Sequence, residues 1–175
     1  MNVTLEPFEP RDLELLKRWL SSPHVRPWYP DPARDMDIAT VQPPGGFHAL
    51  IAVGGTPVGY LRWRYVDRDT LDELGLKEIP AESVDIDILI GEASQTAKGA
   101  GPEALELLAQ QLLADSSVPM LGLTTSIRNV RAQSAFAKAG FSILLQYDPA
   151  GDGLRHLMVR DLREERSSAS RPAGA

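Results

Sequence analysis

Residues 83–101 read SVDIDILIGEASQTAKGAG and decide the fold, because they join a strand pattern directly to a glycine-rich turn. The first part alternates, so one face of the strand carries Val84, Ile86, Ile88 and Ile90 and the other carries Asp85, Asp87 and Leu89. After the turn, Pro102 opens a run of leucines and alanines at helical spacing that reaches Asp115. The segment therefore predicts a half-buried strand, a tight turn and a helix in succession.

The turn at residues 95–101 has the composition of an anion-binding site. Backbone N–H groups of a glycine-rich turn at a helix N-terminus converge on an anion and gain from the helix dipole. Gly99 and Gly101 remove side chains that would block close approach, and Lys98 adds positive charge. Many such turns only reverse the chain, so the pattern alone is weak. It matches neither a nucleotide P-loop nor a dinucleotide fingerprint.

Periodicity and turn residues predict the remaining elements on both sides of this segment. Alternating hydrophobicity predicts further strands at 2–6, 47–53, 57–66, 120–125, 141–147 and 154–159. Helical spacing predicts helices from Pro10 to Leu20 and from Asn129 to Ala139. Residues 21–46 contain six prolines, which predicts an ordered loop with room for one short turn of helix.

Composition bounds the class of protein. The chain has 175 residues, 43% of them hydrophobic, and fits one soluble domain, expected at residues 1–163. Residues 164–175, rich in Ser, Arg, Pro and Ala, are expected to be a disordered tail. No apolar run approaches the ~20 residues of a membrane span, and the N-terminus lacks the pattern of a secretory signal. With no cysteine and three scattered histidines, we expect a cytoplasmic protein without a metal site.

The charge of the chain is unevenly distributed. The net charge of −6 argues against a nucleic-acid partner. Between Asp67 and Glu92 there are nine acidic residues against two basic ones. This stretch is either a solvated acidic loop or a region whose negative electrostatic potential attracts a cationic ligand. The sequence is compatible with both interpretations.

Two later segments complete a family pattern. Together with 129–132 (NVRA) and 138–141 (KAGF), the segment 86–101 resembles the GNAT superfamily of N-acetyltransferases. Within it the chain looks most like the aminoglycoside 6′-N-acetyltransferases, which share an early histidine followed by two aromatics, here His24, Trp28 and Tyr29. The resemblance implies a three-layer α/β fold, with a mixed central sheet of about seven strands and helices on both faces.

The resemblance also implies a coenzyme site for acetyl-CoA. In the family, the strand at 83–91 splays from the strand at 120–125, and the pantetheine arm lies in the gap. Backbone at Ile88, Leu89 and Ile90 would then bind the arm, and the pyrophosphate would be held by Gln95, Lys98, Gly99, Ala100 and Gly101. Asn129 would touch the coenzyme as well as cap its helix. Phe136 stands where the family has a tyrosine that protonates the departing thiolate.

The same resemblance assigns the acceptor side. Asp87 matches the catalytic base, and Asp85 would bind the substrate ammonium or strengthen that base. Without the resemblance, both carboxylates are interpreted simply as residues on the solvent-facing side of a half-buried strand. Trp28 and Tyr29 would either line a substrate cleft or cover the edge of the core.

The implied function is acetyl transfer from acetyl-CoA to an amine of a small cationic acceptor, with aminoglycoside 6′-N-acetylation, and hence antibiotic resistance, as one candidate. The aminoglycoside branch has an acidic residue where this chain reads Leu123-Thr124-Thr125-Ser126, which counts against that acceptor. Siderophore-precursor acylation, protein N-terminal acylation and, because of Phe136, a non-catalytic acyl-CoA-binding regulator stay open. The protein is expected to be a monomer or a homodimer.

Overall fold

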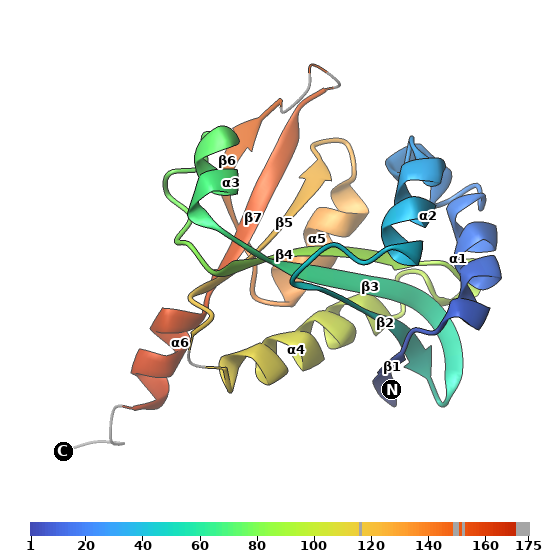
Figure 1. The fold of residues 1–175 in the computed structure, drawn as a ribbon. Coiled ribbons are helices and arrows are strands. Elements are labelled where there is room, and N and C mark those ends of the chain that lie inside the picture. The colour runs from blue at the N-terminus through green and yellow to red at the C-terminus, as the bar shows by residue number, and fades with distance from the viewer. Residues whose placement is uncertain (116, 149–150, 152, 171–175) are drawn as a thin grey trace.

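A single seven-stranded sheet forms the centre of the protein (Figure 1), seen in a computed structural model that describes residues 1–115, 117–148, 151 and 153–170. The strand order is β1-β2-β3-β4-β5-β7-β6. The strands are β1 (Val3–Pro7), β2 (Gly46–Val53), β3 (Thr56–Val66), β4 (Ser83–Ile90), β5 (Met120–Ser126), β6 (Ser142–Tyr147) and β7 (Arg155–Asp161). Only β4 and β5 pair in parallel. The expected mixed sheet of seven strands is confirmed.

Helices lie on both faces of this sheet. They are α1 (Leu13–Leu20), α2 (Pro32–Thr40), α3 (Arg68–Glu73), α4 (Ala100–Leu113), α5 (Val130–Lys138) and α6 (Leu162–Ala169). Helices α4 and α5 cover one face and form the main core with the inward residues of β4 and β5. On the other face α1 and α2 cover one end, and α3 packs over the other end. The opposite face thus carries two separate apolar clusters, which we call the α1–α2 cluster and the α3 cluster.

Three of the helices differ from the sequence-based expectation. Residues 32–40 are helical because Asp31 caps the helix through the N–H of Arg34 and Pro32 occupies its first turn, where proline costs no hydrogen bond. Within the acidic stretch, Asp67 caps α3 in the same way. These caps stabilise short helices that apolar periodicity alone does not reveal.

The third helix, α6, occupies residues 162–169, most of which were expected to belong to a disordered tail. Arg166 holds it in place by donating to four backbone carbonyls in and just after the last turn of α4, those of Leu112, Leu113, Asp115 and Val118. Residues 171–175 lie outside the described part of the chain.

Strand β4 loses its parallel partner part of the way along. It pairs with β5 only at Val84–Leu121 and Asp85–Gly122, although β4 itself continues to Ile90. Pairing with β3 on the other side runs over the whole of β4. The two central strands therefore part after Asp85, as the family resemblance implied.

The far end of β4 is fixed by a buried tryptophan. A Cβ atom on Gly91 would overlap the indole of Trp19, which is fully buried in the α1–α2 cluster. The Trp19 Nε1–H donates to Glu92 (2.8 Å), and Arg18 pairs with the same carboxylate at 2.6 Å. Close approach to the indole therefore requires glycine at position 91.

Gly91→Ala should lower the free energy of unfolding by about 1–3 kcal/mol, because the added methyl must displace Trp19 or the end of β4. Gly122→Ala is the matched control, since a Cβ there would meet Leu157 at an ordinary 3.7 Å. Urea unfolding of both variants measures the difference. Equal stabilities would show that Trp19 does not constrain the end of β4.

Candidate functional site

A polar zone crosses the sheet between the α1–α2 cluster and the α3 cluster. Along β3, Tyr60 belongs to the first cluster and Val66 to the second, and Arg62 and Arg64 lie between them on the same face. Strand β4 runs antiparallel to β3 and repeats the pattern. Its buried Leu89 belongs to the α1–α2 cluster, and Asp87 and Asp85 lie next to it on the same face, toward the α3 cluster. The register places Arg62 opposite Asp87 and Arg64 opposite Asp85. Opposite charges therefore face each other across the two strands.

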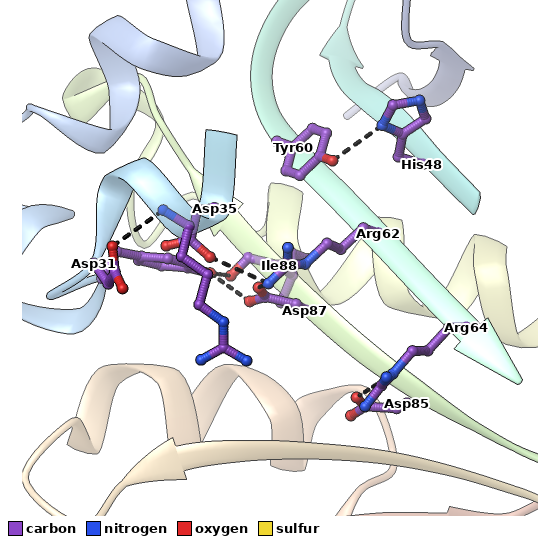
Figure 2. A network of polar contacts seen from close by, with 11 residues as sticks. Asp31, Asp35, His48, Tyr60, Arg62, Arg64, Asp85, Asp87 and Ile88 are labelled. Atoms are coloured by element: carbon purple, nitrogen blue, oxygen red, sulfur yellow. Dashed lines mark hydrogen bonds and ion pairs between the residues drawn. The ribbon is translucent and has the colours of Figure 1, made fainter. Parts of the chain in front are cut away.

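Arg62 lies at the centre of this zone (Figure 2). Its Nη2 atom is 2.7 Å from Asp87 Oδ2 and 3.2 Å from Asp35 Oδ1, so one nitrogen bridges two carboxylates. Asp35 comes from α2, which brings a residue far away in the sequence to β4. The side chains of Arg62 and Asp35 are 21% and 18% exposed, whereas that of Asp87 is 35% exposed. Asp87 is therefore the more accessible of the two carboxylates.

Tyr29 holds the other oxygen of Asp87. Its hydroxyl lies 2.6 Å from Asp87 Oδ1 and 2.9 Å from the carbonyl oxygen of Ile88, so both acceptors are within hydrogen-bonding distance. Burial raises the pKa of the Tyr29 phenol well above its ordinary value, and the Asp87 charge raises it further. The ring packs on the α1–α2 cluster, so Tyr29 both covers the core edge and contacts Asp87. Trp28 is half-buried in the preceding 3-10 turn (Arg26–Trp28).

The other two carboxylates of the zone are perturbed by their surroundings. Desolvation raises the pKa of Asp35, and repulsion from Asp87 adds to this, while Arg62 opposes both. Desolvation also raises the pKa of Asp85, against the effect of Arg64, whose Nε lies 3.4 Å away. The structure thus places Tyr29 against Asp87, with Asp85 two residues back on the same face of β4.

Sequence reasoning singled out neither Arg62 nor Asp35, which joins the site through Arg62. Arg62 lies in the strand predicted at 57–66, and Asp35 lies in the segment interpreted as a loop. One signal was available for the arginines: Arg62 and Arg64 alternate with the same period as Asp85 and Asp87 in the strand that pairs next along the chain. Nothing local marks Asp35, since only the packing of α2 carries it to the site.

The glycine-rich turn leads into α4, which begins at Ala100, two residues before the expected start at Pro102. Gly99 caps the helix in the left-handed region (φ 99°), which accounts for glycine there. Gly101 is different, because a Cβ atom would meet nothing closer than Ile90 at 3.9 Å. Packing within the chain therefore does not explain its missing side chain. Ala100 is buried, Lys98 is exposed, and Gln95 lines a shallow groove with Arg18 and Val58.

Two carbonyls of the splayed part of β4 are already hydrogen-bonded. The carbonyl of Ile88 accepts from Tyr29, and that of Ile90 lies 3.0 Å from Nε2 of His24. The side chain of Leu89 is buried in the α1–α2 cluster. The segment from His24 to Tyr29 therefore runs along the strand expected to bind a pantetheine arm.

Helix α5 carries the last two predicted residues. Asn129 caps it, with Oδ1 accepting from the N–H of Ala132 at 3.1 Å, so the capping interpretation is confirmed. Phe136 is 8% exposed and packs in the main core, where it offers no hydroxyl.

The described part of the chain offers neither a metal site nor a membrane-spanning helix. In residues 1–115, 117–148, 151 and 153–170 there is no group of three or more His, Cys, Asp or Glu side chains that could hold a metal ion. Over the same residues, no helix combines the length and the apolar character that crossing a membrane requires.

Comparisons with known proteins agree on one family. A family model described as acetyltransferase (GNAT) domain matches residues 9–148. The chain is 29% identical, over 149 residues, to the aminoglycoside N(6′)-acetyltransferases type 1 of Klebsiella pneumoniae and Serratia marcescens, which covers 80% of this chain and 74% of theirs.

Solved structures give the same picture. A crystal structure of an aminoglycoside acetyltransferase in complex with coenzyme A and kanamycin is 25% identical, with a TM-score of 0.80 over 97% of this chain and 100% of that one. An aminoglycoside N(6′)-acetyltransferase from Legionella pneumophila shares the fold at 18% identity, with a TM-score of 0.71 over 96% of this chain and 98% of its own.

Asp35→Asn and Asp67→Asn should change stability with opposite dependence on pH. The raised pKa of Asp35 means that its charged form costs stability at neutral pH, and the cost disappears as pH falls below the unfolded value of about 3.9. Hydrogen bonds from Thr70 lower the pKa of Asp67, so its charge stabilises above that value and the effect is lost as pH falls.

Thermal unfolding from about pH 7 to about pH 3.5 tests both signs. At neutral pH, Asp35→Asn should be at least as stable as wild type and Asp67→Asn less stable, and both differences should shrink in acid. A less stable Asp35→Asn at neutral pH would mean that its ion pair with Arg62 outweighs its dehydration.

Proposed function

Because the chain belongs to the GNAT family of acetyltransferases, as its sequence resemblance implied, we propose that it transfers the acetyl group of acetyl-CoA to an amine of a small cationic acceptor. The observation that carries this proposal is Asp87, a partly exposed carboxylate on β4 beside the point where β4 and β5 part. The named relatives support an aminoglycoside acceptor, acetylated at its 6′-amine, as the finer form of the proposal.

The coenzyme side of the proposal uses the splayed strand and the turn before α4. A pantetheine arm in the gap adds to β4 as a strand would, through main-chain groups at Ile88, Leu89 and Ile90. Its amides compete there with Tyr29 and His24 for two carbonyls. The pyrophosphate lies against the turn, where Gly101 leaves room and the N-terminus of α4 favours an anion.

On the acceptor side, Asp87 removes a proton. A protonated amine has no lone pair, so it must lose a proton before it attacks the carbonyl carbon of the thioester. Asp87 accepts that proton, and Tyr29 fixes the orientation of its carboxylate. The tetrahedral intermediate then collapses by breaking the C–S bond. Phe136 gives no proton to the thiolate, but a thiol of pKa about 8.5 leaves without full protonation.

The acidic stretch gives limited support for a polycationic acceptor. Asp67 caps α3, Asp72 pairs with Arg68, and Glu92 binds Trp19 and Arg18. Part of the acidic stretch therefore has structural partners, while Glu73, Glu78 and Glu82 are exposed. Siderophore precursors and protein N-termini remain rival acceptors, which a panel of amines separates.

Asp87→Asn should lower turnover by roughly 10²–10⁴ and leave the affinity for acetyl-CoA nearly unchanged, because the amide keeps the shape but cannot take a proton. The matched control is Asp85→Asn on the same face of β4, which should raise KM for the amine and largely preserve kcat. Steady-state kinetics and calorimetry measure these values. Turnover of Asp87→Asn within about threefold of wild type at about pH 8 would exclude Asp87 as the base.

Gly101→Glu should weaken acetyl-CoA binding at least about tenfold, or about 1.4 kcal/mol, since it places bulk and negative charge against the pyrophosphate. Position 101 is a better test than Gly99, whose positive φ would strain any side chain. Leu107→Glu adds the same charge at an exposed position of α4 and serves as the control. Calorimetric affinities of Gly101→Glu and Leu107→Glu that agree would remove the turn from the site.

A further inference from the structure

We propose that Arg62 determines which amines the site accepts, because its guanidinium permanently fills one of two adjacent cation positions formed by Asp35 and Asp87. An acceptor can then place one ammonium beside Asp87 but not a second beside Asp35. The inference rests on the proposed function in one respect, the assignment of Asp87 to the acceptor side.

The two positions follow from the contacts of a single nitrogen. Arg62 Nη2 reaches Asp87 at 2.7 Å and Asp35 at 3.2 Å, so the two carboxylates lie close enough to bind two neighbouring ammonium groups (Figure 2). Asp35 is the more buried partner, and the exposed remainder of Asp87 is what an acceptor meets first. An ammonium that approaches from solvent therefore pairs with Asp87, either beside Arg62 or in its place, while Arg62 stays paired with Asp35.

The local charges leave room for one more cation. Asp31, Asp35, Asp85 and Asp87 contribute four negative charges, and Arg34, Arg62 and Arg64 contribute three positive ones. Arg64 is held by Asp85 at 3.4 Å. One negative charge is thus unbalanced. A first ammonium neutralises it, and a second one beside Asp35 meets the guanidinium of Arg62 at close range.

Arg62 occupies the cation position beside Asp35 throughout the ordinary pH range. A guanidinium stays protonated in proteins, so Arg62 cannot vacate its place by losing charge. Its strand is also fixed on both sides, opposite His48 of β2 and opposite Asp87 of β4. The cation position at Asp35 is therefore a fixed part of the site.

The test compares Arg62→Gln with wild type, using 1,3-diaminopropane and propylamine as probes. NMR titration gives the affinity of each amine for the protein loaded with coenzyme A, at about pH 8. In Arg62→Gln the ratio of diamine to monoamine affinity should rise at least tenfold, because both carboxylates become available. KM values for the two amines should follow the affinities.

Three further variants show whether the gain comes from the vacated position. Arg62→Lys keeps the cation and should keep the wild-type ratio. Arg11→Gln removes the same charge from an exposed side chain on the surface and should also leave the ratio unchanged. Asp35→Asn combined with Arg62→Gln leaves one carboxylate and should lose the gain.

A folded Arg62→Gln with the wild-type ratio overturns the inference, and so does a gain that survives in the double variant. These binding measurements do not depend on turnover. If the diamine preference appears but no amine is acetylated, the inference holds and the proposed function fails. If amines are acetylated and the ratio does not change, the proposed function holds and the inference fails.

Discussion

The packing of β4 against α4 is the constraint on which the rest of the structure depends. Val84 and Ile86 are buried in the main core, and Ile88 and Ile90 pack against it. Because side chains alternate along a strand, this burial forces Asp85 and Asp87 onto the opposite face. There they lie between two apolar clusters rather than inside either one. The register with β3 then sets an arginine opposite each aspartate.

The same arrangement explains why charged side chains occur in the polar zone, although burial removes part of their hydration. Burial raises the pKa of both Asp35 and Asp85, repulsion from Asp87 adds to it, and arginines only partly offset these effects. Carboxylates held in this way contribute little to stability, whereas they suit binding and proton transfer. Arg62 neutralises part of the negative charge of the carboxylates and so lowers the cost of holding them together. By the same pairing, it limits how many further cations the carboxylates can bind.

Particular residues show how far the sequence could predict this molecule. The alternation at 84–90 and the cap at Asn129 are local patterns, and both were predicted correctly. Helix α2 was missed because the prolines of residues 21–46 were counted as breakers, although Pro32 directly follows the cap residue Asp31 and so marks a helix start. Helix α6 depends on Arg166 reaching the end of α4, and the pairing of Arg62 with Asp35 depends on where α2 packs. Such tertiary contacts leave no periodic trace in the sequence.

The central claim is that this chain catalyses acetyl transfer, although it has Phe136 where the resemblance to the family implies a tyrosine. The most direct measurement follows thiol release from acetyl-CoA with a panel of monoamines, diamines, aminoglycosides and peptides, with the products identified by mass spectrometry. The account predicts acetylated amine and free coenzyme A in equal amounts for at least one primary amine. Tight binding of acetyl-CoA without acetylation of any amine would contradict it and would identify a non-catalytic acyl-CoA-binding protein.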